Sequence, residues 1–206
     1  MPLLAEITLP EKVELAFWLM TESTDELVES TPLSKEDKIE WDSLRHNKRK
    51  KEWIASRAAL RTGLQINDPI LYHETGKPYA ASTEISLSHC LPLAGALKHG
   101  SFAGFDIQHP DPKIAVIKTK FANAPELKEA EDSGDELNYL TIIWSAKEAI
   151  FKVYGENLAF ADEMRIHPFT IGQEVINATI SREDNSIEHV LRVFKIHDHW
   201  VVVVVK

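Results

Sequence analysis

The sequence predicts a mixed fold of the α+β (α/β) class, made of two similar α/β halves. Short apolar strands alternate with amphipathic helices along the 206 residues. The segment WIASRAALRTG, which starts at Trp53, recurs in outline as WSAKEAIFKVYG from Trp144, with Arg57 aligned to Glu148 and Arg61 to Lys152. If this repeat reflects structure, residues 1–100 and 101–206 form related halves that present polar helix faces to one cleft.

Composition and charge restrict the class of function. The chain is 44% hydrophobic and 27% charged, as in ordinary globular proteins, and its net charge of −9 argues against a general nucleic-acid binder. A single cysteine, Cys90, excludes an internal disulfide framework, and the N-terminus lacks the segments of a secretory signal. No apolar run approaches the length of a membrane span. We therefore expect a cytoplasmic protein with no nucleic-acid and no membrane partner.

The first half is predicted to contain early strands, two helices and a β-rich end. Strands are expected near residues 6–9 and 15–20, and helices over residues 34–46 and 47–63, with Asn47 as N-cap and Gly63 as stop. Further strands are expected at residues 70–73, 84–89 and 93–98. The segment 45–61 carries seven Lys or Arg against one Glu, which indicates a local anion site or, equally, a solvated helix face.

The second half is predicted to begin and end with strands. A strand over residues 101–108 is expected to pair with the strand at 93–98 through a turn at Lys98 to Gly100. HPDP stops this strand because prolines lack donors, and a helical region follows. Strands are then expected at 164–167 and 175–180, before a hairpin of HVLRVFKI and WVVVVVK that turns at residues 197–199. The run VVVVV is expected to be a buried strand.

Two charged residues share one face of the predicted helix at residues 144–155. Glu148 and Lys152 lie one turn apart, opposite the apolar Ile143, Ala146 and Ile150. A surface ion pair of this order contributes only about 0.3–0.5 kcal/mol, and the helix alone favours that interpretation.

The strand SFAGFDIQ places Asp106 and Gln108 on one face, since side chains alternate along a strand. Burying an unpaired carboxylate is costly, so Asp106 needs a partner. With Glu148 it would make a carboxylate pair of the kind that Mg²⁺ takes together with water and phosphate oxygens. The alternative is that Asp106 ends the strand and caps the HPDP turn.

Four motifs now occur in order: GKP at 76–78, SLSH at 86–89, GFDIQ at 104–108 and WSAKEAIFK at 144–152. In this order and near this spacing the sequence resembles the 4′-phosphopantetheinyl transferases, in particular the monomeric surfactin-synthetase type. GKP alone is weak evidence, whereas the last motif is specific. The flanking FWLMTES and RKKEWIASRAAL extend the resemblance over almost the whole chain. It implies two α/β halves related by pseudo-twofold symmetry, within a monomer.

The resemblance also implies an activity and its partners. A holo-[acyl-carrier-protein] synthase type enzyme transfers the phosphopantetheine arm of coenzyme A to a serine of an apo acyl, polyketide or peptidyl carrier protein, with Mg²⁺, and releases 3′,5′-ADP. Such enzymes serve fatty acid or secondary metabolite biosynthesis. Asp106, Gln108 and Glu148 would bind the metal, Glu148 would also take the serine proton, and Lys152 would reach the phosphate being cleaved.

Coenzyme A is expected to contact residues of both halves. By similarity, Arg57 meets the 3′-phosphate, and His89, paired with Ser88, meets another phosphate. Lys77 and Pro78 would line the adenine and phosphate pocket. The list of candidate ligands is completed by Lys147, which lies about 100° around the helix from Glu148, and by Lys152. The segment FANAPEL, residues 121–127, is the expected carrier-facing surface.

Gln108 departs from the family pattern, because many relatives have Glu at this place. An amide is a weaker ligand for Mg²⁺, so the metal affinity is open, and a non-catalytic member that binds coenzyme A or a carrier protein is the alternative function. Two other sites are disfavoured. His89 and Cys90 point to opposite faces of a strand, which argues against a cysteine hydrolase, and His197 and His199 lack further zinc ligands. The remaining histidines are expected at the surface.

Overall fold

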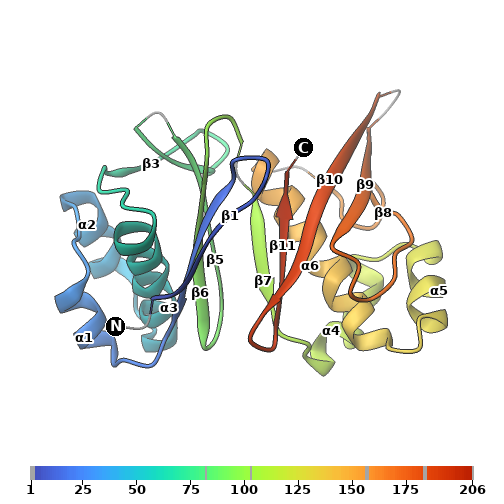
Figure 1. Cartoon of the computed structure of the whole chain (residues 1–206), viewed down its shortest axis with the longest axis horizontal. Coiled ribbons are helices and arrows are strands. Elements are labelled where there is room, and N and C mark those ends of the chain that lie inside the picture. The colour runs from blue at the N-terminus through green and yellow to red at the C-terminus, as the bar shows by residue number, and fades with distance from the viewer. Residues whose placement is uncertain (1–2, 82, 103, 156–157, 183–184, 206) are drawn as a thin grey trace. The chain divides into compact units, whose positions relative to one another are not determined.

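The computed structural model describes residues 3–81, 83–102, 104–155, 158–182 and 185–205. The chain divides into two compact units, Met1–Ala103 and Gly104–Lys206. We call them the N-terminal and the C-terminal unit. Each has its own antiparallel sheet and its own helices, coloured blue to green in the first and green to red in the second (Figure 1). Mixed α/β architecture with two sheets confirms the predicted fold class.

The N-terminal unit packs its longest helix against the middle of its sheet. Its elements are β1 (Leu3–Thr8), β2 (Glu14–Leu19), α1 (Thr24–Ser30), α2 (Lys35–Ser43), α3 (Asn47–Ala58), the π-helical turn η1 (Ala59–Gly63), β3 (Ile70–Tyr72), β4 (Pro78–Ala80), β5 (Thr83–Cys90) and β6 (Leu93–His99). The sheet order is β1-β2-β6-β5-β4-β3. Helix α3 contacts β2, β5 and β6, and Trp53 and Ile54 of this helix join the buried core.

Local sequence explains where these helices begin and end. Ser34 starts α2 with a capping box in which its side chain accepts from the N–H of Asp37. Helix α3 begins without a side-chain cap, because His46 is its N-cap residue and Asn47 is already helical. The prediction that Asn47 caps the helix is therefore wrong. The predicted stop at Gly63 is confirmed: a Cβ there would lie 2.4 Å from the Cβ of Ala16 on β2, so only glycine allows this close approach.

Along the described part of the C-terminal unit, three α-helices follow the first strand and precede the other four strands. Its elements are β7 (Phe105–Gln108), α4 (Pro112–Val116), the short 3₁₀ helix η2 (Lys118–Lys120), α5 (Ala124–Asp132), α6 (Glu136–Tyr154), β8 (Met164–Ile166), β9 (Val175–Arg182), β10 (Asn185–Ile196) and β11 (His199–Val204). The sheet order is β7-β11-β10-β9-β8, and α6 packs against β7, β11 and β8. Of WVVVVVK, Lys206 lies outside the described residues.

Strand pairing confirms one predicted hairpin and contradicts another. Strands β10 and β11 form the terminal hairpin, and the valines of β11 are buried. The predicted pairing of residues 93–98 with 101–108 is wrong, because β6 pairs with β2 and β5 whereas β7 pairs with β11. The turn at Lys98 to Gly100 thus leads from one sheet to the next, since the N-terminal unit already supplies both neighbours of β6.

The two sheets share one strand order. Without β1, the first reads β2-β6-β5-β4-β3 and the second β7-β11-β10-β9-β8, and the chain passes through the matched strands in the same sequence in both. In the described residues each unit carries its helices between the first two matched strands, and α3 and α6 occupy equivalent places along the chain. This agreement supports the internal repeat; the pseudo-twofold axis stays a prediction. None of the helices in the described ranges has the length and apolar character to cross a membrane.

Candidate functional site

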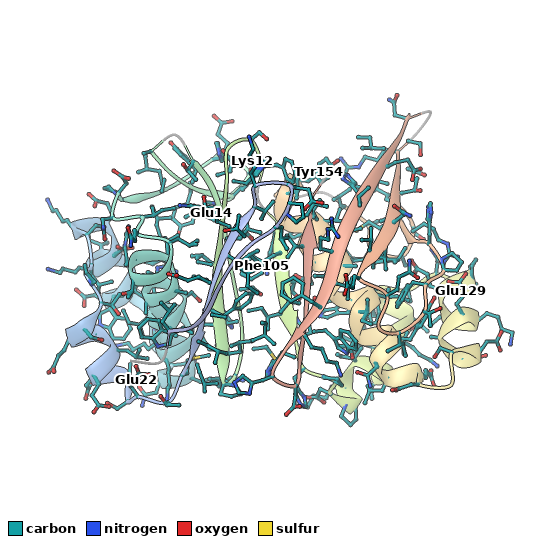
Figure 2. All side chains as sticks on the ribbon, viewed as in Figure 1. Lys12, Glu14, Glu22, Phe105, Glu129 and Tyr154 are labelled. Carbon is teal, nitrogen blue, oxygen red and sulfur yellow. The ribbon has the colours of Figure 1, made fainter. Side chains whose placement is uncertain are left out.

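Strand β7 presents an acid and an amide side by side. Asp106 is 3% exposed, and the Nε2 of Gln108 donates to its Oδ2 at 2.9 Å. Phe105, labelled in Figure 2, and Ile107 are fully buried on the alternate positions. The predicted alternation along this strand is therefore confirmed. The cap of the HPDP turn is Asp111, whose side chain accepts from the N–H of Lys113, so Asp106 is not needed for that role.

Helix α6 carries Lys152 to the same strand. The helix starts at the N-cap Asp135 and stops at Gly155, whose φ of +90° is the left-handed conformation that favours glycine. The Nζ of Lys152 donates to the Oδ1 of Asp106 at 2.7 Å and to the carbonyl of Phe105 at 3.0 Å. A partly buried bridge between a helix and a strand is not the exposed surface pair that the helix alone suggested.

Glu148 lies in an environment that opposes its ionisation. Burial, followed by the negative charge of Asp106, raises the pKa of Glu148 to about 7, against the opposing effect of Lys152. Lys152, one turn along α6 from Glu148, donates to Asp106, so the face of the helix that carries Glu148 is the one turned toward β7. With one Lys for two carboxylates, the cluster has a deficit of positive charge. Glu148 is thereby poised to give up or take a proton near neutral pH.

This donor set fits a hard divalent cation. Mg²⁺ typically takes one or two carboxylates and completes its shell with water and phosphate oxygens. Asp106 and Glu148 supply two such carboxylates, and their mutual repulsion is what a cation would relieve. Gln108 adds an amide instead of a third acid, and among the described residues no group of three His, Cys, Asp or Glu is placed to hold a metal. The candidate metal centre therefore consists of two carboxylates and an amide.

Lys147 does not belong to this cluster. Its side chain is 0% exposed, and its Nζ donates to the Oε2 of Glu126 at 2.7 Å. Three backbone carbonyls, those of Phe121, Phe160 and Met164, accept from the same ammonium. Burial lowers the pKa of Lys147 although Glu126 opposes this effect. The prediction that Lys147 binds coenzyme A is wrong for this structure, because the ammonium is surrounded by acceptors and has no accessible surface.

The expected carrier-facing segment is only partly accessible. Phe121, Ala122 and Glu126 are buried, whereas Asn123 and Leu127 are half-buried and Ala124 and Pro125 are exposed, so only part of FANAPEL offers its side chains to a partner. The physical reason is that Glu126 caps α5 and pairs with Lys147, which draws the segment inward.

Histidines depart from the surface prediction in two places. His189 is buried and lies 2.8 Å from the hydroxyl of Tyr154. His199 is buried as well, with its ring 5.2 Å from that of His109. The turn itself exposes His197. Within the described ranges no third ligand joins these rings, so a zinc site has no support.

In the N-terminal unit, Arg57 is held by acids of α2. Its Nη2 donates to Glu40 Oε2 at 2.9 Å, its Nε lies 3.8 Å from Asp37, and its guanidinium stacks 3.8 Å from the ring of Trp53. Arg61 is bound even more completely, by Asp37 at 2.6 Å and by the carbonyls of residues 66 and 68. Arg61 is thus part of a structural ion pair with Asp37. The sequence alone predicted neither Asp37 nor Glu40 as a partner of these arginines. The one available signal was the Ser-x-x-Asp pattern at residues 34–37, which is typical of a helix start and would have placed Asp37 in its first turn.

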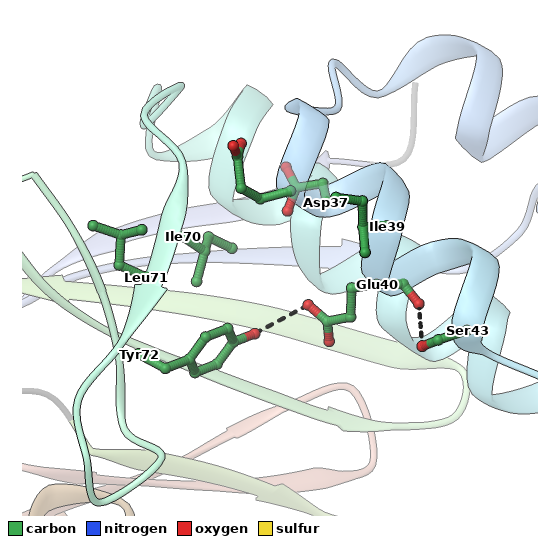
Figure 3. Close-up of a pocket in the computed structure, with 8 residues that line it drawn as sticks. Asp37, Ile39, Glu40, Ser43, Ile70, Leu71 and Tyr72 are labelled. Carbon is green, nitrogen blue, oxygen red and sulfur yellow. Dashed lines mark hydrogen bonds between the residues drawn. The ribbon is translucent and has the colours of Figure 1, made fainter.

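A hollow of about 610 Å³ lies between α2 and β3, beside Arg57. Figure 3 shows Tyr72 reaching toward Glu40, whose carboxylate accepts the phenol hydrogen at 3.1 Å. Burial is the largest of the effects that raise the pKa of Tyr72. The lining residues are Glu36, Asp37, Ile39, Glu40, Ser43, Ile70, Leu71 and Tyr72. Arg57 therefore lies next to a hollow of ligand size whose wall is acidic and apolar.

The other predicted coenzyme A ligands are spread over β4, β5 and the turn between β3 and β4. Lys77 pairs with Glu84 at 2.8 Å, and although burial opposes it, this contact lowers the pKa of Glu84. Pro78 opens β4 and is half-buried, and Ser88 is buried on β5. His89 lies 2.5 Å from a guanidinium nitrogen of Arg49, which brings a basic residue of α3 to the Ser-His pair.

Comparison with known proteins agrees with these observations. A family model described as 4'-phosphopantetheinyl transferase superfamily matches residues 103–205, which is half of the chain and nearly all of the C-terminal unit. A search of curated proteins returned no match. The matched range includes Asp106, Gln108, Glu148 and Lys152, the residues that the structure brings together. The chain therefore belongs to the 4′-phosphopantetheinyl transferase superfamily.

Proposed function

We propose that the protein transfers the 4′-phosphopantetheine arm of coenzyme A to a serine of an apo carrier protein and releases 3′,5′-ADP, with Mg²⁺ as cofactor. Membership of the superfamily supports phosphopantetheinyl transfer in general. The observation that carries the finer proposal is the half-buried Glu148 of α6, whose pKa is raised by burial and by Asp106 of β7, while Lys152 of the same helix donates to that aspartate. The two-unit chain with one repeated sheet order favours the surfactin-synthetase type, acting as a cytoplasmic monomer.

Each residue of the cluster has a distinct task in this reaction. The serine oxygen forms a bond to the phosphorus that carries the pantetheine arm, and the bond from that phosphorus to the oxygen of 3′,5′-ADP breaks. Glu148 takes the proton of the serine hydroxyl, directly or through water, since its pKa near 7 suits a base at neutral pH. Asp106, Glu148 and Gln108 would hold Mg²⁺, which supplies charge neutralisation at the diphosphate. Lys152 steadies Asp106 and donates toward the leaving phosphate.

The proposed contacts to the nucleotide come from the N-terminal unit. Arg57 is assigned to the 3′-phosphate, and His89 with Ser88 to another phosphate. Lys77 and Pro78 are assigned to the adenine and phosphate pocket. A phosphate at Arg57 has to compete with Glu40, which already accepts a hydrogen bond from the guanidinium. This competition lowers the gain from that contact, whereas His89 and Arg49 are already adjacent.

The decisive experiment weighs the carrier protein. The purified protein is incubated with coenzyme A, Mg²⁺ and separate apo acyl, polyketide and peptidyl carriers, and each carrier is analysed by intact mass spectrometry. We expect a gain of one phosphopantetheine arm on at least one carrier and an equal amount of 3′,5′-ADP. A panel of carriers without any mass gain would refute the transfer.

Gln108 supports a second candidate function, a member of the superfamily that binds coenzyme A or a carrier without transfer. Its amide donates to Asp106 where an acid would add a third negative ligand. Calorimetric titration with coenzyme A would give binding under both candidates. Only transfer gives 3′,5′-ADP, so binding of coenzyme A without this product would favour the second candidate.

A further inference from the structure

The C-terminal unit contains a fully buried ion pair whose lysine lies on the helix that also carries Glu148 and Lys152. The side chains of Lys147 and Glu126 are both 0% exposed, and their charged atoms are 2.7 Å apart. Burying two charges costs several kcal/mol per ion before their attraction repays it, so such a pair is weak evidence for stability alone. Lys147 is also the sequence neighbour of Glu148. These two facts raise the question of what the pair does for the site.

Lys147 joins α6 to chain segments on both sides of it. Its ammonium donates at 2.7 Å to the carbonyl of Phe121, which precedes α5. It also donates at 2.8 and 2.9 Å to the carbonyls of Phe160 and Met164, which follow α6. One side chain in the middle of the helix therefore fixes the segments that lead into the helices and out of them.

Glu126 extends this network to the sheet. Its Oε1 accepts from the N–H of Ile166 on β8 at 2.7 Å, while its Oε2 accepts from Lys147 and from the N–H of Asn123 in the capping box of α5. Arg165 adds a contact to Glu129 of α5, labelled in Figure 2. The carboxylate is thus bound from α5, α6 and β8 at once, and α6 has little freedom to turn about its axis.

The rotation of α6 decides where Glu148 lies. Successive side chains of a helix diverge by about 100°, so Lys147 faces α5 and β8 while Glu148 faces β7. At a helix radius of about 5–6 Å, a rotation of about 20° would move the tip of a side chain by about 2 Å. Displacements of about 1 Å at a reacting group can cost a factor of about 100 in rate. Fixing the helix through Lys147 therefore fixes the carboxylate at Asp106.

We propose that Lys147 and Glu126 are positioning residues, whose buried pair sets the rotation of α6 and thereby holds Glu148 opposite Asp106 for cation binding and catalysis. This inference rests on the proposed function. It replaces the direct contact with coenzyme A that the sequence suggested for Lys147. The pair acts through Glu148 and touches neither substrate.

The test removes both charges together, in the double variant Lys147→Met/Glu126→Gln. Methionine fills the volume of the lysine stem, and the glutamine oxygen can still accept from the N–H of Ile166, so no unpaired charge is buried. We expect kcat to fall by about 10- to 100-fold while KM for coenzyme A changes less than about twofold. We also expect Mn²⁺, measured directly by electron paramagnetic resonance, to bind about tenfold more weakly, because its two carboxylates are no longer aligned.

Three results would overturn the inference. A rise in KM for coenzyme A with unchanged kcat would restore Lys147 as a ligand of coenzyme A. A lower melting temperature with normal kcat and normal Mn²⁺ affinity would make the pair merely structural. Failure of the unchanged protein to bind Mn²⁺ would remove the cation site that the pair is said to align. If the unchanged protein binds Mn²⁺ but does not transfer, the proposed function fails and the Mn²⁺ comparison still decides this inference.

Matched variants keep the test interpretable. Lys128→Met/Asp132→Asn removes another ion pair of α5, with charged atoms 2.5 Å apart and both side chains exposed, and is expected to leave kcat and Mn²⁺ binding unchanged. Glu126→Gln alone keeps Lys147 and an acceptor oxygen. It should give a smaller loss in the same direction and carries the test if the double variant does not fold.

Discussion

Helices α3 and α6 occupy equivalent places in two units of the same strand order, yet the charged side chains at their aligned positions differ in how far opposite charges neutralise them. In the repeat, Arg57 aligns with Glu148 and Arg61 with Lys152. Arg61 has Asp37 and two carbonyls as partners, and Arg57 has Asp37 and Glu40.

At the aligned positions of α6, Lys152 pairs with Asp106, whereas burial and a like charge raise the pKa of Glu148 to about 7. The difference shows that the same arrangement of strands and helix can either pair each charged side chain with an opposite charge or keep two like charges close together. The second arrangement is the one that a cation and a proton acceptor require, and perturbed groups of this kind gather at functional sites. The predictions that follow test this contrast.

The largest effect is expected for Glu148→Gln, which removes the proposed base and a metal ligand while keeping the shape of the side chain. Transfer to the carrier should fall by at least about 1,000-fold, measured by mass spectrometry of the carrier. The circular dichroism spectrum should not change. Glu136→Gln, at the half-buried first position of the same helix, where the side chain pairs with Lys118, is the control and should keep normal turnover. Near-normal turnover by Glu148→Gln would remove Glu148 from its role.

Arg57 of α3 and Arg61 of the following turn η1 are expected to differ from one another. Arg57→Lys should raise KM for coenzyme A about tenfold, because an ammonium cannot reproduce the planar fork of a guanidinium at a phosphate. Arg61→Lys should leave KM unchanged but lower the melting temperature by several degrees, since the buried Arg61 donates to Asp37 and to the carbonyls of residues 66 and 68. Steady-state kinetics and thermal melts check both. Equal effects on KM would refute the assignment of Arg57.

Gln108→Glu sharpens the contrast by adding a third acid to the strand. The Mg²⁺ concentration for half-maximal activity should fall about tenfold, because a carboxylate binds Mg²⁺ better than an amide does. Without metal, the variant should melt at a lower temperature, since it loses the hydrogen bond from Gln108 to Asp106 and gains a like charge. Melts with and without Mg²⁺ give the measurement. An unchanged Mg²⁺ requirement would exclude residue 108 from the metal shell.

The smallest effect concerns stability and pH in the presence of a chelator. The pKa of Glu148 is raised from 4.5 to about 7, so the folded state holds this proton more tightly than the unfolded chain does. Stability from this group is therefore fully present below about pH 4.5 and is lost as pH rises through about 7, by about 3 kcal/mol. Denaturant titrations should show this loss in the unchanged protein but not in Glu148→Gln. Parallel pH profiles for the two proteins would contradict the raised pKa.

Period and spacing predicted much of the fold and part of the site. Alternation along GFDIQ predicted that Asp106 and Gln108 share a face, and helical spacing put Glu148 one turn from Lys152, because both patterns depend on local geometry alone. The partners of these residues depend on chain segments distant in sequence. Lys147 illustrates this limit. Helical geometry predicted that its side chain points about 100° away from Glu148, but its acceptors belong to residues 121, 126, 160 and 164, which only folding brings to it.

Strand partners show the same limit. The pattern of residues 93–108 is typical of a hairpin. In the structure β6 instead pairs with β2 and β5, and β7 pairs with β11, so β6 and β7 do not pair with each other. Likewise, Arg57 of α3 and Arg61 of η1 were evident in the sequence. Their partners Asp37 and Glu40 belong to α2 and neutralise them only in the folded chain.

By itself, the sequence predicted the fold class and the repeated helix motif from periodicity, which is a local property of the chain, and its resemblance to a known family supplied the residues of the candidate metal centre. Only the tertiary structure decided which charges are neutralised and which are not. Burial and charge pairing depend on contacts across long sequence separations, so charged residues of the two helices end in different environments. Arg57 is bound by acids of α2, Lys147 forms a buried ion pair, and Glu148 has a pKa near 7.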